Sequence, residues 1–114
     1  MVVGIGFRPG TAGSVILAAL RECLGDNGIR CLATIDRRGG EAGLAAAAGE
    51  LGVPIVVFTA AELAAVAEPA VSPRVAAAVG TPSVAEAAAL LATGSGELVL
   101  RKRVVGGVTV AAAR

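Results

Sequence analysis

The sequence of 114 residues contains no histidine, no tryptophan and no tyrosine. Without histidine, the chain lacks the base of a Ser-His-Asp triad and the imidazole ligands that many zinc sites use. Phe7 and Phe58 are the only aromatic residues, so the bases of a single-stranded nucleic acid would find few rings for stacking. These absences argue against a zinc enzyme and a histidine-dependent hydrolase, and we expect neither a bound metal nor a resident cofactor.

Cysteine is also scarce. The two cysteines, Cys23 and Cys31, fall within a predicted helix and a predicted strand, respectively. Isolated cysteines in such segments are typical of packed thiols rather than of a disulfide or a metal-binding pair. We therefore expect both thiols to be free.

Charge is nearly balanced, with ten Lys and Arg against nine Asp and Glu, and the two signs are interspersed. A general nucleic-acid binder or a membrane-surface helix would carry a basic stripe, so neither partner is expected. No apolar run reaches the roughly 18–20 residues of a membrane span, and the first residues do not resemble a signal peptide. The sequence therefore favours a cytoplasmic protein.

Hydrophobic residues make up 55% of the chain, but much of that fraction is alanine. Alanine favours helix and buries little area per residue, so the core must depend on Val, Leu and Ile. The length fits one domain over residues 1–114. A homo-oligomer is a candidate state, because self-association would add buried surface to a small core.

Strand and helix patterns alternate from the first residue, which predicts an α/β fold with parallel strands. Two final strands joined by Gly106-Gly107 predict an antiparallel hairpin, so the sheet is mostly parallel but mixed. The unbroken apolar run over 54–58 predicts a strand buried on both faces. The expected strands are 2–6, 29–34, 54–58, 97–104 and 108–113, and the expected helices are 11–24, 41–51, 59–67, 72–79 and 83–92.

Ligands of open α/β sheets bind beyond the carboxyl ends of the strands. Most polar residues outside the predicted helix surfaces fall at that rim. The residues that this topology places there are Arg8, Pro9, Gly10 and Thr11 after the first strand, Thr34, Asp36 and Arg37 after the second, and Thr59 and Glu62 after the third. Gly6, at the end of the first strand, is a further candidate ligand contact.

The Gly-rich turn after the first strand suggests an anion site. Glycines let the backbone approach a ligand at a helix N-terminus, and Arg8 offers a planar charged fork for a carboxylate or phosphate. Thr11 could cap the helix or donate its hydroxyl. Gly4 and Gly6 fit a dinucleotide fingerprint, but Pro9 stands where its third glycine would be. A tight turn without any ligand explains the same residues equally well.

Other polar residues carry weaker signals. Asp36 could act as a general base or bind a hydroxyl, although a solvated charge paired with a neighbouring arginine explains it more simply. Lys102 could face the ligand crevice, whereas the alternative for Arg101-Lys102-Arg103 is protection of an exposed sheet edge. Capping boxes explain Thr59 with Glu62 and Ser83 with Glu86.

Several segments together form a recognisable pattern in a fixed order. They are 4–11 (GIGFRPGT), 32–36 (LATID), 52–54 (GVP), 59–63 (TAAEL), Ser72-Pro73, Val79-Gly80, 83–90 (SVAEAAAL), Lys102 and 106–111 (GGVTVA). This pattern resembles the cobalamin-biosynthesis CobE family, which corresponds to the C-terminal domain of CbiG. The resemblance covers nearly the whole chain and implies a three-layer α/β/α domain with a mixed sheet.

The resemblance also implies a role in building the corrin ring. CbiG opens a lactone on a cobalt-precorrin and carries further regions that are missing here, whereas CobE-type proteins consist of this domain alone. We therefore expect an accessory protein that binds a corrin intermediate, with other enzymes of the pathway as further candidate partners. Lactone hydrolysis with Asp36 as base, and a small nucleotide-binding module, remain alternatives.

Overall fold

The computed structural model describes residues 1–25, 28–66, 83–94 and 96–114. Apart from one short 3-10 helix that the sequence does not predict, its elements agree with the predicted strands and helices of these residues to within two positions at each end. They are β1 (Val2–Gly6), α1 (Gly13–Leu24), β2 (Cys31–Ile35), the 3-10 helix η1 (Asp36–Arg38), α2 (Ala42–Leu51), β3 (Ile55–Phe58), α3 (Ala60–Ala65), α5 (Val84–Thr93), β4 (Leu98–Val105) and β5 (Val108–Ala113). The predicted helix over 72–79, with its Ser72-Pro73 start, lies outside the described residues, as do Asp26, Asn27 and Ser95.

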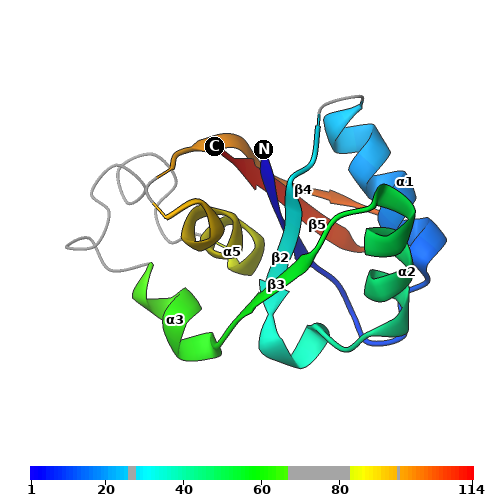
Figure 1. The fold of residues 1–114 in the computed structure, drawn as a ribbon, viewed down its shortest axis with the longest axis horizontal. Helices are drawn as coiled ribbons and strands as arrows, with labels where there is room; N and C mark the ends of the chain where they lie inside the picture. Colours follow the sequence, from blue (N-terminus) through cyan, green and yellow to red (C-terminus); the bar gives the residue numbers. More distant parts are fainter. Residues whose placement is uncertain (26–27, 67–82, 95) are drawn as a thin grey trace.

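The strands form one five-stranded sheet in the order β3-β2-β1-β5-β4 (Figure 1). β1 pairs in parallel with β2, and β2 in parallel with β3, while β5 runs antiparallel to both β1 and β4. The β4–β5 hairpin turns through Gly106 and Gly107, both at positive φ, which glycine adopts at little cost. The expected α/β fold with a mixed sheet and a C-terminal hairpin is confirmed.

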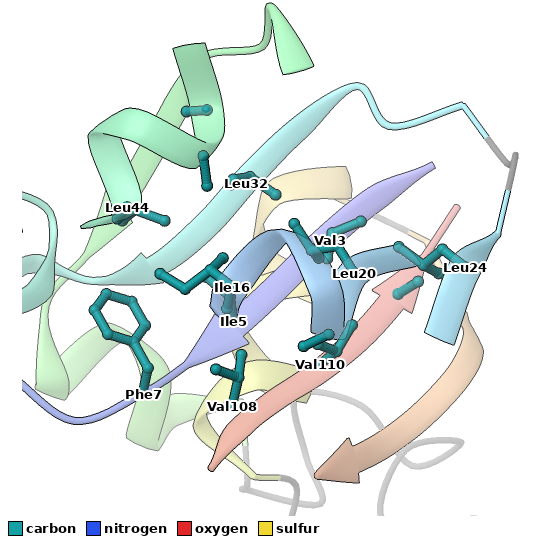
Figure 2. Close-up of a cluster of buried hydrophobic side chains, with 14 residues drawn as sticks. Val3, Ile5, Phe7, Ile16, Leu20, Leu24, Leu32, Leu44, Val108 and Val110 are labelled. Atoms are coloured by element: carbon teal, nitrogen blue, oxygen red, sulfur yellow. The ribbon is translucent and has the colours of Figure 1, made fainter. Parts of the chain in front are cut away.

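Helices cover both faces of the sheet, which confirms the three-layer arrangement. α1 and α2 lie on one face, and α3 and α5 lie on the other (Figure 1). The core under α1 and α2 consists of alternating strand residues such as Val3 and Ile5 packed against Ile16 and Leu20, with Phe7 at one end (Figure 2). Under α5 the core is built largely of alanines, which lets that helix approach the sheet closely.

The prediction that 54–58 would be buried on both faces is wrong. β3 is an edge strand, and its side chains are only partly buried, with Val57 46% exposed. An edge strand has a neighbour on one side only, which leaves its side chains more exposed than those of an internal strand. An apolar run in the sequence does not by itself distinguish the two kinds of strand. The internal strand β2, in contrast, is buried along its whole length.

The two cysteines are free thiols, as predicted. Burial raises the pKa of the Cys23 thiol and also that of the Cys31 thiol, against smaller opposing effects of Arg103 and Arg30, respectively. Both side chains are therefore protonated at neutral pH and act as small packing groups. Among the described residues, no helix is both long and apolar enough to cross a membrane.

Candidate functional site

A cavity of about 170 Å³ lies beyond the carboxyl ends of β1 and β2. This is the rim at which parallel α/β sheets bind their ligands. Its lining comes from the last residues of both strands, from Phe7 just after β1, from η1 and from the first residue of α5. The lining residues are Gly6, Phe7, Thr34, Ile35, Arg37, Arg38 and Val84. Of the residues predicted from the sequence, Gly6, Thr34 and Arg37 are therefore brought together here.

The cavity exists because α5 covers β1 at Gly4 but not at Gly6, the last residue of the strand. At Gly4, a Cβ atom would lie 1.7 Å from the carbonyl oxygen of Ala85, so the helix touches the strand backbone there. At Gly6, two residues on, a Cβ atom would meet only the Cβ of Thr109, at 3.7 Å. Since alternate residues of a strand share a face, Gly4 and Gly6 face the same side of the sheet, and only Gly4 is covered by α5.

Two arginines supply the positive charge of the cavity. Arg38 is half-buried, and its Nε donates a hydrogen bond to the carbonyl oxygen of Phe7 at 3.1 Å. That contact fixes one side of the guanidinium and leaves its other N–H groups for further acceptors. Arg37 is exposed at the cavity mouth. The pair suits a carboxylate or phosphate, for which a guanidinium fork is the best-shaped partner.

Thr34 holds the two strands together at the cavity floor. It is fully buried, and its hydroxyl donates to the carbonyl oxygen of Ile5 at 2.8 Å. The proton of this hydroxyl is therefore already engaged within the protein. Thr34 shapes the cavity more than it offers a donor to a ligand.

The Gly-rich loop is closed by contacts within the chain. The backbone N–H of Gly10 donates to a carboxylate oxygen of Glu41 at 2.9 Å, so this residue's own N–H already holds an anionic group. Arg8, Pro9 and Gly10 are exposed, and none of the three lines the cavity. The loop does bind an anionic group through a backbone N–H, as its composition suggests. That group is the carboxylate of Glu41 and not an external ligand.

The suggestion that Thr11 caps the following helix is wrong. Helix α1 begins at Gly13 with Ala12 as its N-cap and without a side-chain cap. The Thr11 hydroxyl instead donates to the carbonyl oxygen of Arg8 at 2.7 Å, within the loop. Thr11 lies one residue too early to reach the free N–H groups of the helix, and it stabilises the turn instead.

Asp36 and Lys102 are not among the residues that line the cavity. Asp36 is exposed and opens η1, where its carbonyl oxygen accepts from the Gly39 N–H at 3.0 Å. Lys102 is exposed on β4, which β5 separates from β1, so two strand spacings of roughly 5 Å each lie between Lys102 and β1. Both residues remain predictions as ligand contacts.

Glu86 is a structural residue that the capping box explains only in part. The residue is only 4% exposed, and its Oε1 accepts from the Ser83 N–H at 2.9 Å as the box requires. Its other oxygen, Oε2, accepts from the backbone N–H of Lys102 at 3.2 Å. There the register of β4 against β5 shifts between Leu100 and Arg103, a bulge that frees backbone groups from the ladder. Glu86 thus ties the start of α5, where Val84 lines the cavity, to β4.

Replacing Glu86 with alanine is expected to lower the free energy of unfolding by about 2 kcal/mol, because both N–H groups lose a charged acceptor. Glu62 provides a matched control, since it closes the same type of box at Thr59 but is exposed. Glu62→Ala is expected to cost only about 0.5–1 kcal/mol. Urea unfolding of both variants measures the difference, and equal losses would remove the assigned role of the Lys102 contact.

Sequence reasoning missed four lining residues: Phe7, Ile35, Arg38 and Val84. Arg38 adjoins Arg37 in the same polar elbow, so the sequence did contain a signal for it. Val84 follows the predicted N-cap Ser83, but nothing local indicates that this helix starts at the ends of β1 and β2. That proximity depends on contacts between distant parts of the chain.

Comparison with known proteins identifies the relatives of this fold. A sequence model of the family described as "Cobalamin synthesis G C-terminus" matches residues 1–113. The crystal structure of cobalamin biosynthesis protein chiG from Agrobacterium tumefaciens str. C58 is similar, with 41% sequence identity and a TM-score of 0.82 over 98% of this chain and 95% of that one. The crystal structure of CobE, a protein from the cobalamin (vitamin B12) biosynthetic pathway, is 32% identical with a TM-score of 0.75 over 99% and 88% of the two chains. No curated protein matches the sequence.

Proposed function

The chain belongs to the cobalamin synthesis G C-terminus family, and we propose that it binds a corrin-ring intermediate of cobalamin biosynthesis. It acts as an accessory protein or carrier, and its binding site is the cavity beyond β1 and β2. The pairing of Arg37 and Arg38 with apolar walls is the observation that carries the proposal. Corrin intermediates combine an apolar ring periphery with acetate and propionate carboxylates. A guanidinium pair beside an apolar surface matches both features.

The lining of the cavity favours binding over catalysis. Opening a lactone needs a base to activate water and a donor to stabilise the oxyanion. Thr34 is the only hydroxyl among the lining residues, and its proton is engaged by Ile5. Asp36, the candidate base, is exposed in η1 and does not line the cavity. The arginines could stabilise an anion, but they have no partner base in this lining.

The nucleotide-binding alternative gains little support. Of the two fingerprint glycines, Gly4 packs against the backbone of α5 and only Gly6 opens onto the cavity. Pro9 stands at the third glycine position, and the N–H of Gly10 is occupied by Glu41. The loop therefore lacks two of the three glycine positions that the dinucleotide fingerprint requires.

The test is a titration of the protein with cobyrinic acid, a corrin with free carboxylates, followed by its visible absorption. Saturable binding is expected, and cobinamide, whose side chains are amidated, is expected to bind more weakly. Release of a product from a lactone-bearing precorrin would instead indicate a hydrolase. Absence of binding by any corrin would reject the proposal, and saturable binding of a nucleotide in its place would favour the nucleotide-binding alternative.

Arg37→Ala is expected to weaken cobyrinic acid binding by at least about tenfold, since a charge-assisted hydrogen bond contributes about 1.5–3 kcal/mol. Arg21→Ala is the matched control, because it removes the same charge from the exposed last turn of α1. The control is expected to leave the dissociation constant unchanged. Arg8→Ala shows in the same assay whether the neighbouring loop also contacts the ligand. Equal effects of the Arg37 and Arg21 variants would mean that only net charge matters.

A further inference from the structure

The cavity is far smaller than a corrin. At about 170 Å³, it falls below the roughly 300–1,000 Å³ of pockets that enclose a drug-sized ligand. A cavity of about 150 Å³ is sufficient for a single benzene ring. This cavity therefore has room for one small ring or a short substituent, whereas the macrocycle must remain outside.

The walls of the cavity fit such a fragment. Phe7, Ile35 and Val84 provide apolar surface, and Val84 is 46% exposed although it is a large aliphatic residue. Gly6 leaves space between these walls, because no side chain projects from this strand position. Arg37 and Arg38 then lie where a carboxylate attached to the fragment would be held.

We infer that the domain holds its corrin by one edge, with a single ring of the macrocycle and its carboxylate arm in the cavity and both faces of the macrocycle left exposed. This inference rests on the proposed function. An edge-held corrin stays accessible at its central metal and along the rest of its periphery. A second protein can then contact the ligand before the first releases it, which is the geometry that direct transfer requires.

Accessibility of the ring faces is tested by axial ligation. Aquacyano-cobyrinic acid takes up a second cyanide at cobalt, and the reaction is followed by its visible absorption, for the free corrin and for the corrin bound to the protein. Coupling between two binding events is reciprocal, so an exposed face predicts cyanide affinities that differ by less than about twofold. A face buried against the protein predicts coupling of roughly 5–150-fold instead. The latter result overturns edge binding while leaving corrin binding intact.

The location of the held edge is tested at Gly6. Gly6→Ala adds one methyl group to the cavity without close contacts, and it is expected to weaken cobyrinic acid binding by at least about tenfold. Gly49→Ala adds the same group to exposed space on α2 and serves as the control. Thermal unfolding of both variants establishes that each is folded.

Three results contradict the inference in different ways. An unchanged affinity of the Gly6 variant shows that the edge is held elsewhere, and suppressed cyanide binding shows that a face is covered. Failure of the unmodified protein to bind any corrin rejects the proposed function and edge binding together.

Discussion

Gly4→Ala is expected to lower the free energy of unfolding by about 3–5 kcal/mol, which is a large part of the roughly 5–15 kcal/mol that stabilises a typical domain. The added Cβ would lie 1.7 Å from the carbonyl oxygen of Ala85 and 2.9 Å from the N of Ala89. Both obstacles are backbone atoms of α5, so no side-chain rotation relieves them. The helix must move away from the sheet, and the alanine-rich core beneath it would lose its close packing.

Gly6→Ala is the matched control, since it lies in the same strand and faces the same side of the sheet. Its Cβ would make one ordinary contact, with Thr109, and replacing a strand glycine reduces the entropy lost on folding. Thermal unfolding should show a fall of roughly 10–20 °C for Gly4→Ala and an equal or slightly higher transition for Gly6→Ala. Similar transitions for the two variants would contradict the direct packing of α5 on β1.

The contrast between these two glycines shows what the sequence can and cannot specify. Their spacing suggested a shared role in phosphate binding, yet Gly4 serves helix packing and Gly6 opens the cavity. Their roles differ because α5 covers Gly4 but not Gly6. This helix is formed by residues about eighty positions later in the chain. A local pattern contains no information about where a distant helix begins relative to a strand.

Local chemistry, in contrast, was sufficient for the elements themselves. Apolar runs, capping boxes and glycine turns predicted the strand and helix order, and both capping boxes formed as expected. The second contact of Glu86, to the Lys102 N–H, could not be predicted because it depends on a bulge in β4. Bulges arise from strand register, which is set by packing across the sheet.

The Gly-rich loop is a second case in which the local sequence does not specify a distant contact. Its residues were correctly placed after β1, but the partner of the Gly10 N–H is Glu41, thirty-one residues away. Glutamate at the start of a helix ordinarily suggests an interaction with that helix's own N–H groups. Here the carboxylate reaches the neighbouring loop instead, and α2 has no side-chain cap.

Gly43→Ala is the second substitution with a large expected effect, and two opposing contributions determine its sign. Alanine is favoured over glycine in a helix by about 1 kcal/mol, so propensity alone predicts stabilisation. A Cβ at position 43, however, would lie 2.0 Å from the carbonyl oxygen of Thr11 and 3.1 Å from its carbonyl carbon. This overlap is again with backbone, and it would push the start of α2 away from the loop that leads into α1.

We therefore expect Gly43→Ala to lower the free energy of unfolding by about 3 kcal/mol in total, since overpacking of this kind outweighs the gain in propensity. Gly49→Ala, in the same helix, meets no atom within 4 Å and should raise it by up to about 1 kcal/mol. Urea unfolding of the two variants should thus give shifts of opposite sign from the same chemical change in one helix. If both variants were stabilised, the start of α2 could yield without cost, and the Gly10–Glu41 contact would not depend on close approach at Gly43.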